Sequence, residues 1–187
     1  MDIDFLKNEI KDILSKKRYE HSVRVLETAI SLGKIYKADL NKVAIASLLH
    51  DYAKEFKRDD LINLSKEHFY DETKDYLSNA EILHSYIGTY FAKEKFNITD
   101  SEILNAIKYH TTGRRDMSVV EKIVYLADAI EPKRDYPYVE KIRDLSLINL
   151  DKAILLEVNK KIEYLLKENH VIHVNSVEMR NWLLNLS

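Results

Sequence analysis

The scarcity of residues that end or turn a chain is the feature that most constrains this sequence. Its 187 residues include only three glycines and two prolines. Apolar residues recur at spacings of three and four along nearly the whole chain, which is the period of an amphipathic helix. A sheet would need hairpin turns rich in glycine or asparagine, and no pair of strands with such a turn is visible. The sequence therefore predicts an all-α fold of helices joined by short loops.

This periodicity predicts about ten helices, at 4–16, 18–37, 40–56, 59–69, 80–95, 100–110, 118–130, 138–146, 150–169 and 176–186. Three of the starts carry a capping-box pattern: Thr99 with Glu102, Ser118 with Glu121, and Asn175 with Glu178. Two prolines bracket a non-helical segment at 131–138. No repeat or linker divides the chain. We therefore expect a single domain over 1–187, with the helices of 150–187 packed on the same core.

The composition excludes several classes of function. Lysine and arginine number 29 against 31 aspartates and glutamates, a net charge of −2 that gives no basic field for a nucleic-acid polymer. The chain has no cysteine, so disulfides, thiolate nucleophiles and iron–sulfur clusters are excluded. Three glycines cannot build a Rossmann, P-loop or nucleophile-elbow motif. The longest apolar run, near 43–49, is far short of the ~20 residues that cross a bilayer, and no signal-peptide pattern is visible. We expect a cytoplasmic protein with no membrane partner.

Ionisable side chains continue the inward apolar stripe of five segments: His21, the pair His50-Asp51, His84, His110 and Asp128. A single histidine on such a face is more often a core residue with one hydrogen bond. The adjacent pair is different, because an inward carboxylate is costly to bury without a cation or several donors. A metal ion shared by the pair satisfies both side chains. Asp128 lies inside another apolar run, poses the same problem and accepts the same solution.

Basic side chains near these positions suit the binding of phosphate. Lys54 lies about one helical turn after Asp51, and Arg18 lies about one turn before His21. Two loops carry further clusters: Arg114 and Arg115, and Lys133 and Arg134. Such residues are also common on solvated surfaces, and we prefer that interpretation for Arg115 and Lys133.

The segment before the last predicted helix is a second candidate for an anion site. His170 and His173 flank two apolar residues there, and Asn175 and Ser176 stand at the expected helix start. The N-terminus of a helix presents free backbone N–H groups to an anion. Plain helix capping by the same residues is an equal alternative.

The order of these residues resembles the HD-domain superfamily of metal-dependent phosphohydrolases. That pattern joins a histidine, a His-Asp pair and a distant aspartate, and the extra His84 and His110 match a subset with two further histidines. More specifically, several stretches resemble the YqeK family: Tyr-His-Thr-Thr-Gly at 109–113, Met-Ser at 117–118, Ile-Val-Tyr-Leu-Ala-Asp-Ala-Ile-Glu-Pro at 123–132 and Arg-Asn-Trp-Leu-Leu at 180–184. The similarity covers nearly the whole chain.

The resemblance implies an HD-type helical bundle and a symmetrical bis(5′-nucleosyl)-tetraphosphatase, which cleaves diadenosine tetraphosphate to two ADP. It implies iron as the metal, held by His21, His50, Asp51 and Asp128. It implies a nucleotide met by Arg18, Lys54, His84, His110, Thr111, Arg134, His170, His173, Asn175 and Ser176.

The chemistry of the residues fits this mechanism. Two imidazoles and two carboxylates suit a divalent transition ion, whether iron, manganese, cobalt, nickel or zinc. Such an ion activates a bound water, which Asp51 could orient, while His84 and His110 stabilise charge on the attacked phosphate. The two extra histidines could instead bind a second ion. We favour one ion, with these histidines facing the phosphate.

Three other functions are compatible with the same residues. They are a phosphohydrolase acting on another nucleotide, a non-catalytic nucleotide-binding HD module and an HD-type di-iron oxygenase. The flanking lysines and arginines favour phosphate chemistry. The expected partners are a dinucleoside polyphosphate and ADP, and a homodimer is left open.

Overall fold

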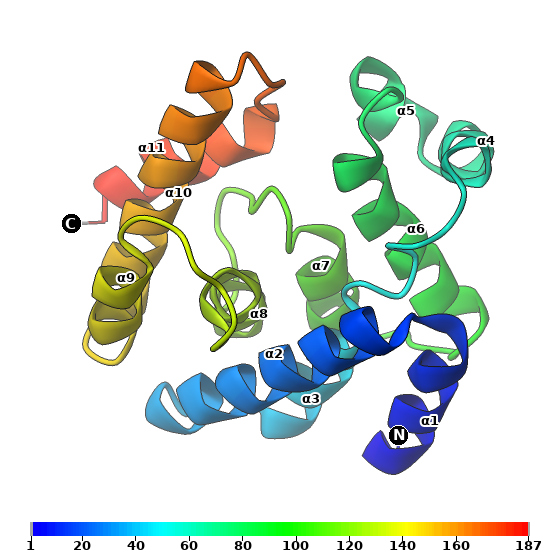
Figure 1. Ribbon diagram of the computed structural model, residues 1–187, viewed down its shortest axis with the longest axis horizontal. Helices are drawn as coiled ribbons and strands as arrows, with labels where there is room; N and C mark the ends of the chain where they lie inside the picture. Colours follow the sequence, from blue (N-terminus) through cyan, green and yellow to red (C-terminus); the bar gives the residue numbers. More distant parts are fainter. Residues whose placement is uncertain (1, 187) are drawn as a thin grey trace.

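The structure, a computed structural model, describes residues 2–186 and is built of helices without any strand over that range (Figure 1). Met1 and Ser187, the ends of the predicted domain, lie outside the described residues. The described elements are α1 (Ile3–Ile13), α2 (Lys16–Ile35), α3 (Leu40–Leu49), α4 (Arg58–His68), α5 (Tyr70–Thr73), the short 3₁₀ helix η1 (Lys74–Tyr76), α6 (Ala80–Glu94), α7 (Ser101–Lys108), α8 (Val119–Ile130), α9 (Val139–Ser146), α10 (Leu150–Lys167) and α11 (Val174–Leu184). The predicted all-α class is confirmed.

Several predicted helices extend past their true ends, including those at 4–16, 18–37 and 100–110, and the largest error falls at the candidate site. The helix expected at 40–56 ends at Leu49, and turns follow over 50–55. The apolar pattern continues past the true end because Tyr52 and Ala53, although in turns, still pack into the core. His50 therefore caps the helix and Asp51 follows it, so that the pair sits on a chain reversal rather than on a regular helix face.

Two of the three predicted capping boxes are wrong, and a short helical stretch was not predicted. The Ser118 box is present as expected. The cap of α7 is Asp100 rather than Thr99, because its carboxylate accepts from two backbone N–H groups of the first turn. α11 begins at Val174, two residues earlier than expected, with His173 as its cap. The segment that forms α5 and η1 at 70–76 has too little apolar periodicity to predict a helix.

A continuous buried cluster connects the two ends of the chain. It runs from Leu6 in α1 to Leu183 in α11 and includes Ile154 and Val158 of α10. α2 packs on α3 and α8, whereas α10 packs on α8, α9 and α11. This packing agrees with the prediction that 150–187 shares the core, although the domain boundaries stay a prediction. None of the described helices combines the length and apolar character needed to cross a membrane.

Two glycines allow close packing around the centre of the molecule. A Cβ on Gly88 of α6 would lie 3.5 Å from the carbonyl oxygen of His50, so α6 packs directly against the end of α3. Gly113 has a left-handed φ of +63°, and a Cβ there would come within 2.1 Å of the sulfur of Met179. These contacts hold α6, the end of α3, the loop after α7 and α11 close together.

Candidate metal centre

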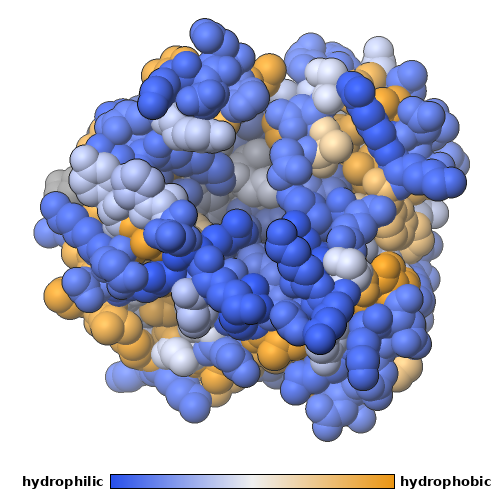
Figure 2. All heavy atoms as spheres, viewed as in Figure 1, coloured by the Kyte–Doolittle hydropathy of each residue, from blue (hydrophilic) through white to orange (hydrophobic). Residues whose placement is uncertain are grey.

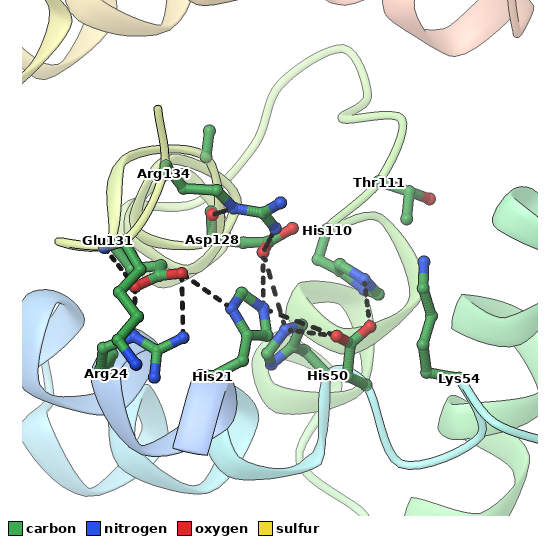
Figure 3. A network of polar contacts seen from close by, with 12 residues as sticks. His21, Arg24, His50, Lys54, His110, Thr111, Asp128, Glu131 and Arg134 are labelled. Carbon is green, nitrogen blue, oxygen red and sulfur yellow. Dashed lines mark hydrogen bonds and ion pairs between the residues drawn. The ribbon is translucent and has the colours of Figure 1, made fainter. Parts of the chain in front are cut away.

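Side chains from five parts of the chain meet at the centre of the fold (Figure 3). The six sequence-predicted donors converge there: His21 from α2, His50 and Asp51 from the end of α3, His84 from α6, His110 from the turn after α7, and Asp128 from α8. All are buried except Asp128, which is partly exposed. Their donor atoms form three overlapping sets, and within each set the atoms lie within 4.8 Å of one another.

The carboxylate of Asp51 joins two groups of imidazoles. Its Oδ2 lies 3.6 Å from Nε2 of His21 and 3.4 Å from Nε2 of His50. Its Oδ1 lies 3.1 Å from Nε2 of His84 and 3.7 Å from Nε2 of His110. Each carboxylate oxygen therefore faces a different histidine pair, so the geometry can accept one ion on the first pair or two ions bridged by Asp51.

Asp128 completes the first group from the opposite side. Its Oδ1 lies 3.0 Å from Nε2 of His21 and 3.9 Å from Nε2 of His50. Arg134 holds this carboxylate in place, because its guanidinium donates to Oδ1 at 2.5 Å and to the backbone oxygen of the same residue at 2.8 Å. Nε2 of His21 and Nε2 of His50 thus each lie within 4 Å of both carboxylates. Imidazoles and carboxylates are ligand types that suit a divalent transition ion.

In three of the histidines, Nδ1 lies beside a backbone carbonyl oxygen. This contact determines which ring nitrogen points to the centre. Nδ1 of His50 and of His110 lies 2.7 and 2.8 Å from a carbonyl oxygen three residues earlier, and Nδ1 of His84 lies 3.3 Å from one four residues earlier. A carbonyl can only accept, so in the neutral rings Nδ1 carries the hydrogen and Nε2 presents a lone pair to the centre. Nε2 of His84 and Nε2 of His110 are only 3.1 Å apart. Two facing lone pairs at that distance need a cation or a proton beside them.

Two of these inward nitrogens are buried without a hydrogen-bond partner: Nε2 of His21 and Nε2 of His50. Buried polar atoms are rarely left unsatisfied, so such atoms need an explanation. Their nearest polar neighbours are carboxylate oxygens, which carry no hydrogen to donate. A divalent cation would satisfy both nitrogens and both carboxylates together. The donor set therefore fits a bound metal ion.

The electrostatics of the site also favour positive charge. Burial alone would raise the pKa of Asp51 and Asp128, yet the facing histidines, and for Asp128 also Arg134, hold both pKa values well below the usual range. Burial opposes protonation of His50, but the two carboxylates raise its pKa. The centre thus keeps two anions and draws a cation toward them.

Sequence reasoning missed the residue that orients His21. Oε1 of Glu131 lies 3.2 Å from Nδ1 of His21, on the side of the ring away from His50 (Figure 3). Arg24 Nε and the backbone N–H of Lys133 donate to the other oxygen at 2.5 and 2.9 Å. Burial opposes ionisation of Glu131, but Arg24, Lys133 and His21 lower its pKa to about 2. The Ile-Glu-Pro stretch that contains Glu131 is the sequence signal that could have identified it. Glu131 does not continue an apolar stripe, so the hydrophobic periodicity does not indicate a functional role for it.

A hollow of about 380 Å³ opens beside the cluster. The predicted residues that line it are Arg18, Asp51, Lys54, His110, Thr111, Asp128, Arg134, His173 and Ser176. Lys161, Glu81 and Val171 also line it and were not predicted. His84 contributes through the cluster rather than through the wall. The face viewed in Figure 2 is mostly hydrophilic.

Charged side chains that line this hollow form ion pairs with one another. Nη1 of Arg18 lies 2.7 Å from Oδ2 of Asp51, and Nζ of Lys54 lies 2.6 Å from Glu81. Both cations can exchange these partners for phosphate oxygens.

The segment 170–176 meets this hollow only in part. The ring of His173 stacks on Tyr76 at 4.1 Å between centroids, and Ser176 Oγ donates to Thr112 O at 2.8 Å. His170 is exposed and does not line the hollow, and neither does Asn175, whose N–H bonds to Nδ1 of His173. Contact of these two residues with a nucleotide stays a prediction.

The all-helical fold and the His/Asp centre together place this protein in a class, the helical hydrolases built around a His/Asp metal site. Comparison with known proteins agrees: the HD domain family matches residues 18–133. A bis(5′-nucleosyl)-tetraphosphatase, symmetrical, from Halalkalibacterium halodurans is 39% identical over 94% of this chain and 93% of its own length. One of the same name from Staphylococcus aureus is 37% identical over 97% of this chain and 94% of its own.

A solved structure is similar over the whole chain. The crystal structure of a predicted HD superfamily hydrolase involved in NAD metabolism, from Clostridium acetobutylicum, has a TM-score of 0.94 and 35% identity, and covers 100% of this chain and 99% of that one. The chain therefore belongs to the HD-domain family and, within it, to the family of the symmetrical bis(5′-nucleosyl)-tetraphosphatases.

Proposed function

We propose that this protein is a metal-dependent enzyme that hydrolyses diadenosine tetraphosphate symmetrically to two molecules of ADP. The observation that carries the proposal is the convergence of four imidazoles and two carboxylates beside a hollow lined by cations. The names of the relatives reported above support the choice of substrate. The cationic wall supports a polyphosphate rather than a neutral substrate.

In this proposal His21, His50, Asp51 and Asp128 hold the ion, and iron is the expected metal. Their ligand types also admit manganese, cobalt, nickel and zinc. When bound, a divalent ion supplies Lewis acidity and lowers the pKa of a coordinated water towards neutrality. Glu131 fixes the ring of His21 from behind, which is the usual role of a carboxylate in the outer shell of a metal site.

The remaining residues bind and orient the substrate. Arg18, Lys54 and Arg134 neutralise charge on the phosphate chain, while His84 and His110 face the attacked phosphorus. Asp51 orients the attacking water, whose oxygen bonds to one of the two central phosphorus atoms. The bond from that phosphorus to the central bridging oxygen breaks, and one ADP leaves with this oxygen. The other ADP carries the oxygen from water.

The test is product analysis with diadenosine tetraphosphate and added Fe²⁺ or Mn²⁺. We expect ADP as the sole nucleotide product, with ¹⁸O from labelled water in half of the ADP molecules. Formation of ATP with AMP, or no turnover with any of the metals, contradicts the proposal. Nucleoside mono- and triphosphates assayed in parallel test the alternative of another nucleotide substrate, and oxygen consumption tests the oxygenase alternative.

A further inference from the structure

We propose that a groove lined by tyrosines, next to the metal centre, binds the second nucleoside of the substrate. The inference rests on the proposed function, because a dinucleoside substrate cleaved in its middle must place one nucleoside on each side of the metal. The tyrosine groove is formed by Tyr136, Pro137 and Tyr138 before α9, and by Lys160, Tyr164 and Lys167 of α10. Its volume is about 560 Å³.

The groove offers what a purine base needs. Tyr138 and Tyr164 are 54% and 58% exposed, so their rings are accessible to a ligand. Aromatic rings of this kind stack on bases of any sequence. Lys160 Nζ lies 4.3 Å from the centroid of the Tyr138 ring and 2.8 Å from Oε2 of Glu163, which also lines the groove, and this ion pair holds the lysine beside the ring.

Tyr138 has a backbone conformation that is unusual for an aromatic residue, and the fold gives little reason for an aromatic ring at this position. Its φ is +76°, in the left-handed region, and it stands at the N-terminus of α9 without a side-chain hydrogen bond to the helix. Asparagine would suit both the backbone and the cap better. Residues held in such conformations are concentrated at ligand-binding sites. A role for the ring in binding explains why a tyrosine occupies this position.

Two cations connect the groove to the metal centre. Arg134 and Lys161 line both the tyrosine groove and the hollow beside the cluster. Arg134 is fixed on Asp128, and Lys161 Nζ donates to the backbone oxygen of Thr111 at 2.7 Å. A phosphate chain that leaves the metal centre between these two cations enters the tyrosine groove directly.

Another groove that adjoins the hollow lacks phenylalanine, tyrosine or tryptophan side chains on which a base could stack. This groove of about 370 Å³, which includes Lys17, Glu20, Arg24 and Lys133, shares Arg18 and Arg134 with the hollow. Its lining contains charged side chains and a histidine but no phenylalanine, tyrosine or tryptophan. It can hold phosphate but offers no ring of these types for stacking, so the tyrosine groove is the better site for the second nucleoside.

The experiment compares two substrates that differ by one nucleoside. Diadenosine tetraphosphate fills both sites, whereas adenosine 5′-tetraphosphate fills one and yields ADP and pyrophosphate. We expect Tyr164→Ala to lower kcat/KM for the dinucleotide by about 5- to 100-fold, the usual worth of one stacked base, and to change it less than about 2-fold for the mononucleotide. Tyr138→Asn should act in the same direction. Tyr70→Ala, which removes a similarly exposed tyrosine on α5 outside the groove, is the matched control and should change neither value.

The possible outcomes distinguish failure of the groove from failure of the proposed function. Selective loss with the dinucleotide in both groove variants supports the inference. If kcat/KM falls equally with both substrates, or does not fall in either variant, the groove does not bind the second nucleoside. The proposed function is unaffected by that result. Selective loss in Lys133→Ala alone assigns the second half of the substrate to the other groove. If the unaltered protein hydrolyses neither substrate, the proposed function fails, and the inference fails with it.

Discussion

The metal centre and the tyrosine groove lie side by side but are built in opposite ways. The donors of the centre are mostly buried, and each inward imidazole is fixed from behind by a carbonyl or carboxylate oxygen. The groove combines the exposed rings of Tyr138 and Tyr164 with lysines and with Tyr136, which packs against the core. Catalysis at a metal ion requires ligand atoms at fixed positions, whereas the binding of a nucleoside can use surface side chains. Changes in the centre should therefore act on metal binding and turnover, and changes around the binding hollows on substrate preference and local stability.

The largest effect should come from the carboxylate that joins the two histidine pairs. Asp51→Asn keeps the shape of the side chain but removes its charge, so we expect loss of bound metal and a fall in kcat of about 10³-fold or more. Metal analysis and steady-state kinetics measure both. Asp12→Asn, on the exposed face of α1, is the matched control. Wild-type turnover in Asp51→Asn would remove this residue from the site.

His84 provides a test of the one-ion arrangement. His84→Ala should lower kcat by about 10²- to 10³-fold, the usual effect of removing one group that stabilises transition-state charge. At least one ion per chain should remain, because the His21 and His50 group is intact. Metal content of the purified variant is the measurement, with thermal unfolding to check the fold. Loss of all metal would contradict the one-ion arrangement.

The residue behind His21 should have a smaller effect. Glu131→Gln leaves a side chain of the same size but weakens the contact to Nδ1, so we expect metal affinity or activity to fall by about 10- to 100-fold. Titration with Mn²⁺ followed by electron paramagnetic resonance measures the affinity. An affinity equal to that of the unaltered protein would show that Glu131 does not support the centre.

Gly113 tests how firmly the loop after His110 is held against α11. Gly113→Ala puts a Cβ at a left-handed position and against the buried Met179, so we expect a loss of roughly 2–4 kcal/mol in the free energy of unfolding. Urea denaturation is the measurement. In a Met179→Ala background the same change should cost less, since part of the clash is removed. An equal cost in both backgrounds would show that the contact with Met179 does not matter.

Stability should depend on pH through His173, which lines the hollow. Burial lowers the pKa of His173 from 6.5 to about 4, so between these values the unfolded chain binds the extra proton and the folded chain does not. The free energy of unfolding should therefore fall as pH drops from 6.5 to 4. His173→Asn retains a capping side chain without the titration, and its dependence on pH should be flatter. Parallel curves for the two proteins, from denaturation at several pH values, would contradict this.

The contrast between the two regions also explains which parts of the fold and of the site could be predicted from the sequence. The His21, His84 and Asp128 positions follow from apolar stripes, because a polar group that continues a buried face must meet other buried groups. The true end of α3 could not be predicted, since Tyr52 and Ala53 extend the apolar pattern through turns. Long-range packing, not periodicity, decides that boundary.

Residues that do not continue a buried apolar stripe leave no comparable signal. Lys161 and Tyr164 belong to a helix with many lysines, and nothing in their spacing separates a ligand-facing position from a solvated one. Glu131 lies next to an apolar run, but its contact with His21 joins residues 110 positions apart. Only the fold brings such pairs together.

The central claim is that imidazoles and carboxylates from five parts of the chain share a cation. Metal content of the purified protein after loading with Fe²⁺ or Mn²⁺ and removal of the excess tests it most directly. We predict at least one tightly bound ion per chain in the unaltered protein and none in Asp51→Asn. An unaltered protein that retains no ion, or an Asp51→Asn variant that retains the same number, would contradict the account.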